Sequence, residues 1–131
     1  MIGLDTNVLV RYIMQDDAGQ SSKATTLIDS FTAQAPGFVA LVSVVELVWV
    51  LSACYGLGRA QLAVALEALL RTRELLVERA EIVWRAACIY RDFKADFADC
   101  LIERCGASAG CERTMTFDQG AARHAGMSLI R

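Results

Sequence analysis

Four acidic residues, in four separate segments of this 131-residue sequence, have the side chains that could bind a metal ion together. Asp5 follows a short apolar run and Asp118 follows a strand-like segment, whereas Glu46 and Asp99 stand near the starts of segments with helical spacing. Carboxylates that crowd together repel one another, so some stay protonated unless a cation joins them. Their oxygens suit Mg²⁺ or Mn²⁺ rather than zinc, and acidic sites with these ions typically act on phosphate esters. The four acids therefore predict a metal-dependent enzyme that acts on a phosphodiester or another phosphate ester.

Each of these acids also has an ordinary structural explanation. Asp5 precedes a helical segment and can cap it. Glu46 stands three residues after Ser43, which is the spacing of a capping box, and Asp96 and Asp99 show the same spacing at a helix start. The fourth acid lies in a turn, where aspartate is common. From the sequence alone, both the catalytic and the structural interpretation stay open.

Strand-like and helix-like segments alternate along the chain, and this alternation is what would bring the acids together. The run at 38–42 has no polar face, which is typical of a central strand covered on both sides. The alternation predicts an α/β fold in which helices cover both faces of a central, mostly parallel sheet. Right-handed connections then place every strand-to-helix turn at one edge, where ligands bind. The expected strands are 2–4, 38–42, 75–77, 113–117 and 127–130, and the expected helices are 6–14, 18–34, 43–55, 59–72, 81–94, 96 to about 106–110, and 119–124.

The composition fits a single domain, residues 1–131, and excludes a protein that binds nucleic acid through a broad basic surface. The formal charge is −2, the pI is about 5.3, and 55% of the residues are hydrophobic. Of the 13 basic residues only Lys23 and Lys94 are lysines, so the other eleven are arginines. A nucleic-acid function must therefore depend on local arginines or on metal ions.

Other kinds of site are not indicated. The five cysteines contain no C-x-x-C pair and His124 is the single histidine, which favours buried, reduced thiols over a zinc site. Neither type of glycine-rich phosphate-binding loop is present. The apolar stretch 38–58 is long enough to span a bilayer, but Glu46 near its middle argues against a membrane partner. No basic leader segment is visible, so we expect a cytoplasmic protein.

The motifs around the four acids, taken in order, resemble those of the PIN-domain ribonucleases, specifically the VapC-type toxins of bacterial toxin–antitoxin pairs. The first motif is GLDTNVLVRY at 3–12, followed by QDD at 15–17 with Gln20 and Lys23. The later motifs are SVVELVWVL at 43–51 with Tyr55, DFADCLI at 96–102, and TFD at 116–118. Each motif is loose alone, whereas the ordered set covers nearly the whole chain and is specific.

This resemblance implies an α/β/α sandwich and an endoribonuclease that depends on Mg²⁺ or Mn²⁺ and cleaves structured RNA, such as tRNA or ribosomal RNA. The implied reaction is in-line attack of a metal-activated water on a phosphodiester. By position, the catalytic and metal-binding residues are Asp5, Glu46, Asp99 and Asp118, and the supporting residues are Asn7, Asp96 and Thr116. Cys100 and Gln119 depart from the residues common at their positions, but neither is an expected ligand.

The resemblance also implies partners, namely the RNA substrate, a second copy of the chain in a homodimer, and a cognate antitoxin protein. Arg11 and Lys23 are candidate contacts for RNA phosphates, with solvated helix positions as the alternative. Trp49 and Tyr55 are candidate anchors of an interface, because aromatic residues are favoured there. Two other functions stay open, a non-catalytic PIN-like domain that binds partners and a small metal-dependent phosphatase.

Overall fold

Three short parallel strands form a sheet in the first of two compact units into which the chain separates, Met1–Ala80 and Glu81–Arg131. The computed structural model describes every residue of the chain. The middle strand, β2, pairs with both others, so that Phe38 lies opposite Gly3 on one side and Leu76 on the other. Because the strands run in the same direction, their carboxyl ends share one edge. The strands are β1 (Ile2–Gly3), β2 (Gly37–Val39) and β3 (Leu75–Val77).

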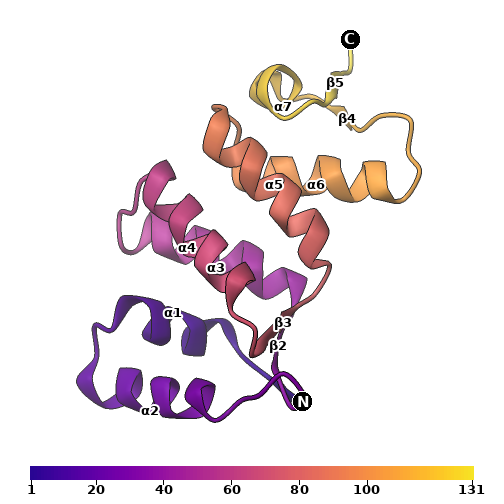
Figure 1. Cartoon of the computed structure of the whole chain (residues 1–131). Coiled ribbons are helices and arrows are strands. Elements are labelled where there is room, and N and C mark those ends of the chain that lie inside the picture. The colour runs from indigo at the N-terminus through magenta and orange to yellow at the C-terminus, as the bar shows by residue number, and fades with distance from the viewer. The chain divides into compact units, whose positions relative to one another are not determined.

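Four helices connect the strands of this N-terminal unit. α1 packs against α2 and α3, while α4 packs against α3 and β3. Figure 1 shows α1 and α2 side by side, at the indigo end of the chain. Both α1 and α3 start where a strand ends, at the shared edge of the sheet. The helices are α1 (Thr6–Met14), α2 (Ala18–Asp29), α3 (Leu41–Ala53) and α4 (Arg59–Arg71).

Apolar residues at helical spacing explain why these segments form helices that pack. Leu47 and Leu51 in α3, and Leu62 and Leu66 in α4, recur every four positions and are at most 2% exposed. Burying one such side chain contributes roughly 1.5–3 kcal/mol to folding. Val39 of the central strand has no exposed surface, which agrees with its apolar surroundings in the sequence.

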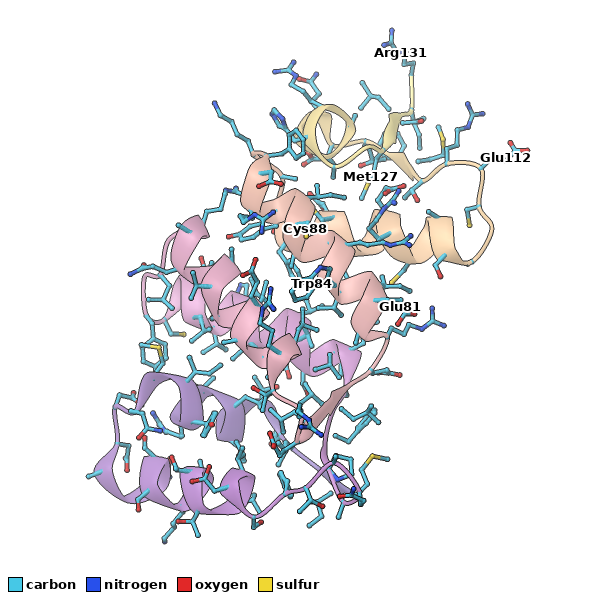
Figure 2. All side chains as sticks on the ribbon, in the orientation of Figure 1. Glu81, Trp84, Cys88, Glu112, Met127 and Arg131 are labelled. Atoms are coloured by element: carbon cyan, nitrogen blue, oxygen red, sulfur yellow. The ribbon has the colours of Figure 1, made fainter.

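The C-terminal unit holds three helices and a second pair of parallel strands. Met115 lies opposite Ser128, and α7 connects the two strands. Where α5 gives way to α6, Tyr90 and Phe97 meet edge to face with 5.9 Å between ring centroids, which stabilises the turn. Figure 2 shows Trp84 and Cys88 following one another along α5. The elements are α5 (Ala80–Asp92), α6 (Phe97–Ser108), β4 (Met115–Thr116), α7 (Gln119–His124) and β5 (Ser128–Leu129).

The predicted α/β class is confirmed, because seven helices alternate with strands that pair only in parallel. The helices Thr6–Met14 and Gln119–His124 and the strand Leu75–Val77 have the predicted bounds. The prediction for α2 is too long, since the helix ends at Asp29 and residues 32–35 form a hydrogen-bonded turn. All five cysteines are free, but only Cys100 is buried. None of the helices is both long and apolar enough to cross a membrane.

α3 begins two residues earlier than predicted, and this overturns the capping-box interpretation. Its N-cap is Ala40, whose side chain accepts no hydrogen bond, and Ser43 lies buried in the first turn. The acceptor comes instead from Glu78, which follows β3. The Leu41 N–H donates to Glu78 Oε1 at 2.7 Å, across 37 positions of sequence.

Replacing Glu78 by alanine should lower the free energy of unfolding by about 0.5–2 kcal/mol, the usual contribution of a side-chain helix cap. The loss arises because the Leu41 N–H loses its acceptor. Glu78→Gln keeps an oxygen acceptor, so its free energy of unfolding should decrease clearly less. Glu112→Ala is the matched control, because Glu112 is exposed in the loop before β4 (Figure 2). Urea denaturation measures all three variants, and equal stability of Glu78→Ala and Glu112→Ala would contradict the cap.

Candidate active site

Asp5 and Glu46 line one cavity of the N-terminal unit. The cavity has a volume of about 430 Å³ and lies between the start of α1 and the side of α3 that carries Glu46 and Val50. This volume is within the range of about 300–1,000 Å³ that is usual for small-ligand sites. Two of the four predicted acids therefore line one cavity that is large enough for a small ligand. Its lining consists of Asp5, Thr6, Asn7, Val10, Arg11, Glu46, Val50, Cys54 and Tyr55.

Asp5 caps a helix and still has an oxygen available for a ligand. It is the N-cap of α1, with an extended backbone (φ −75°, ψ 156°), and its Oδ1 accepts the Thr6 N–H at 2.7 Å. The capping interpretation is therefore right for Asp5. It uses only one carboxylate oxygen, however, and the exposed side chain makes no other hydrogen bond. A cap and a metal ligand are compatible here.

Thr6 joins the two acids and was not identified from the sequence. Its N–H donates to Asp5, and its hydroxyl donates to Glu46 Oε1 at 2.7 Å. Thr6 is 8% exposed, so this hydroxyl is held in a restricted space. The bond crosses 40 positions of sequence, and the only local signal was a threonine directly after the first acid. Glu46 thus has a tertiary partner instead of the predicted local cap.

Asp99 of the C-terminal unit is affected by the charges of two other candidate acids. Asp99 stands in the first turn of α6, and burial raises the pKa of its carboxyl, with further increases from the charges of Asp96 and Asp118. Asp96 occupies the N-cap position of α6, but its side chain forms no capping hydrogen bond. The alternative that Asp96 caps a helix therefore holds for its position, but its side chain does not act as the cap.

Local hydrogen bonds hold Asp118 in place. Its Oδ1 accepts the Ala121 N–H at 2.7 Å, at the start of α7. Its own N–H donates to Thr116 Oγ1 at 3.0 Å, so the threonine orients the backbone that carries the acid. As with Asp5, the cap occupies one carboxylate oxygen and leaves the other without a hydrogen bond.

None of the five candidate acids forms a salt bridge, whereas Asp16, Asp92 and Glu103 each pair with an arginine. Carboxylates without a counter-ion offer oxygen atoms as ligands, and such ligands fit a hard divalent cation. Within neither unit do three acidic, histidine or cysteine side chains converge closely enough to form a complete metal site.

Arg11, beside the first cavity, is held by three side chains. Its Nε donates to Gln20, and its Nη1 donates to Asp16 at 2.9 Å and to the Tyr55 hydroxyl at 3.3 Å. The Tyr55 hydroxyl in turn donates to Asp16 at 2.7 Å. These bonds lower the pKa of Asp16, with Tyr55 the largest cause, and raise the pKa of Arg11. The sequence suggested Arg11 alone as a phosphate contact, but not the partners that position it.

Three other predicted residues lie at the surface of the N-terminal unit. Asn7 is exposed in the cavity beside Asp5, and its side chain makes no hydrogen bond. Lys23 is exposed on α2, with neither a hydrogen bond nor a salt bridge. Trp49 is 66% exposed on α3, so it is not part of the core. All three side chains are therefore accessible to a ligand or partner.

Comparison with known proteins gives one significant result. A family model described as the PIN domain matches residues 2–127, which include all of the candidate site residues in both units. Neither a search of curated proteins nor a search of solved structures found a significant match. PIN domains are generally metal-dependent nucleases, and the oxygen-rich acids described above agree with that chemistry. Because the match spans nearly the whole chain, this protein belongs to the PIN-domain family.

Proposed function

We propose that this protein is an endoribonuclease that acts as the toxin of a toxin–antitoxin pair. The observation that carries the proposal is a set of acids without counter-ions in both units of a PIN domain. Asp5 and Glu46 share one cavity, and Asp99 interacts with Asp118. Membership of the PIN-domain family supports a nuclease. RNA as the substrate, in the form of tRNA or ribosomal RNA, is inferred from the resemblance to VapC-type toxins.

In this proposal, residues 1–131 act as a single nuclease domain. The residues that would hold Mg²⁺ or Mn²⁺ are Asp5, Glu46, Asp99 and Asp118. A bound ion of this kind polarises a phosphoryl oxygen and lowers the pKa of a water.

The chain itself fixes the orientation of these carboxylates. Asp5 and Asp118 each accept a backbone N–H at a helix start, and each keeps one oxygen free. The Thr6 hydroxyl fixes the third acid, Glu46. Positioning these groups in advance reduces the ordering that is needed when the substrate binds. Asp96 supports the site by increasing the negative charge around Asp99.

Partner binding without catalysis is a second candidate function, favoured by an exposed apolar face of α3. Val42 and Trp49 are each 66% exposed, and Glu46 lies between them on the same helix face. Monomeric proteins seldom expose large side chains in groups without a reason. In the toxin proposal, this face belongs to the interface with the antitoxin or with the second copy of a homodimer.

Incubation of the purified protein with total tRNA and ribosomal RNA tests the first candidate. We expect discrete fragments with Mg²⁺ or Mn²⁺ and none with EDTA. Asp5→Asn should produce no fragments, whereas Asp29→Asn should cleave normally, because Asp29 is an exposed acid at the end of α2 without a hydrogen bond. Fragments that persist with EDTA or with Asp5→Asn would contradict the proposal. Absence of fragments together with capture of a partner would favour the second candidate.

Thr6→Val should lower the rate of RNA cleavage by about 10–100-fold, which is typical when a residue that orients a metal ligand is lost. Valine has a similar volume but cannot donate to Glu46, so the carboxylate loses its fixed orientation. Thr26→Val is the matched control, since Thr26 donates only to the Ser22 carbonyl on the exposed side of α2. Single-turnover cleavage compares the variants. A normal rate for Thr6→Val would mean that the bond has no catalytic importance.

A further inference from the structure

A second cavity lies between α1 and α2, and none of the candidate acids lines it. It has a volume of about 410 Å³, and Asn7, Arg11, Gln20 and Lys23 supply its polar lining. Asn7 and Arg11 also line the cavity that contains Asp5 and Glu46. The two residues are one turn apart on α1, or about 6 Å along the helix axis. One face of α1 therefore connects the acidic cavity to this polar one.

The charges in this second cavity favour an anion. Lys23 has no ionic partner and makes no hydrogen bond, so its charge is available to a ligand. Arg11 is paired with Asp16, but only its Nε and Nη1 donate to protein groups. The remaining terminal nitrogen, Nη2, keeps its donors. A phosphate placed here would accept charge-assisted hydrogen bonds from two cationic side chains.

The rest of the lining suits a base or a ribose better than a bare anion. Val8 and Leu27 give the cavity an apolar wall. Gln20 and Asn7 carry amide groups that both donate and accept, as the edges of RNA bases do. An acidic peptide would use the cations but would not need this combination of amides and apolar wall.

We propose that the α1–α2 cavity is a subsite for a nucleotide of single-stranded RNA next to the scissile phosphate. This inference rests on the proposed endoribonuclease function. The neighbouring phosphate lies on Lys23 and Arg11 Nη2, and the base or ribose lies against Val8 and Leu27. Asp16 and Tyr55 act as positioning residues, because they hold the Arg11 guanidinium between the two cavities.

Binding of a six-nucleotide single-stranded RNA in EDTA tests the subsite without any cleavage. We expect Lys23→Gln to weaken binding by about 5–10-fold, in line with the loss of one charge-assisted contact of about 1–1.5 kcal/mol. The slope of log K against log salt should decrease by about 0.7, the value for one phosphate contact on a single strand. Lys94→Gln is the matched control, since Lys94 is exposed and lines neither cavity.

A second variant, Gln20→Glu, keeps an acceptor for Arg11 and adds a negative charge beside the phosphate position. We expect it to weaken RNA binding at least as much as Lys23→Gln. Unchanged binding and an unchanged salt slope for both variants would overturn the subsite, even if metal-dependent cleavage is intact. Effects of both variants on RNA binding would support the subsite, even if no RNA is cleaved with Mn²⁺. Loss of partner-protein binding with normal RNA binding would overturn it in favour of a protein contact.

Discussion

Asp5→Asn and Asp99→Asn should each reduce RNA cleavage by at least about 100-fold, since even residues that only orient metal ligands typically contribute 10–100-fold. The two acids come from different units, and each substitution removes one charge while preserving shape. Asn at position 5 can still accept the Thr6 N–H, so the cap of α1 is preserved and the loss is not caused by unfolding. Initial rates on the RNA found to be cleaved, with circular dichroism as a check on folding, measure the effect.

Matched controls make this result specific to the proposed site. Asp29→Asn in the N-terminal unit and Glu112→Gln in the C-terminal unit remove exposed acids that form no hydrogen bonds. Both should retain the full rate. If Asp5→Asn is inactive and Asp99→Asn is fully active, the C-terminal acids are not part of the catalytic site. Asp96→Asn should show a smaller loss than Asp99→Asn, because Asp96 is assigned a supporting role.

The sequence predicts the fold well where the structural signals are local. α1 follows an aspartate that caps it, and α7 does the same after Asp118, so the bounds of both helices were predicted correctly. The start of α3 was predicted incorrectly, because the group that caps this helix belongs to Glu78, which is far away in the sequence. No pattern within a short window can indicate a partner 37 positions distant.

The same distinction applies to the candidate site. The type of each acid was readable from the sequence, and so were the places of Asp5, Asp99 and Asp118 at helix starts. Glu46 was expected in the first turn of its helix and lies in the second, because α3 begins at Leu41. The bond from Thr6 to Glu46 and the position of Arg11 between Asp16 and Tyr55 were not, because they depend on packing between α1 and α3 and on the loop after each. Sequence patterns thus identified the charged groups, and the structure added the neutral and paired residues that orient them.

Asp99→Asn should raise the melting temperature of the protein in EDTA, even though it removes a residue of the proposed site. In the folded protein, burial and the charges of Asp96 and Asp118 raise the pKa of Asp99 above its ordinary value of 3.8. Ionisation of Asp99 therefore costs more in the folded than in the unfolded chain. This cost develops as the pH rises from the ordinary pKa through the raised one, and it is fully present at neutral pH. Asparagine removes the cost, so the gain in stability should disappear below about pH 3.8, where both states of Asp99 are protonated.

In Mn²⁺, the wild-type protein should have a higher melting temperature than Asp99→Asn, which is the reverse of their order in EDTA. A ligand that binds only the folded state at 100 times its Kd stabilises it by about 2.7 kcal/mol, so wild-type protein should melt several degrees higher in millimolar Mn²⁺. Asp99→Asn should lose most of that increase, because a carboxylate ligand is missing. Thermal melts in EDTA and in Mn²⁺, at neutral pH, compare both proteins with Glu112→Gln.

A wild-type melting temperature that does not respond to Mn²⁺ would contradict the metal site, whereas the same response in wild type and Asp99→Asn would place the ion elsewhere. A purely structural role for Asp99 does not predict that one substitution raises the melting temperature in EDTA and lowers it in Mn²⁺. If the side chain only packed in the helix, its replacement would change the melting temperature in the same direction in both conditions.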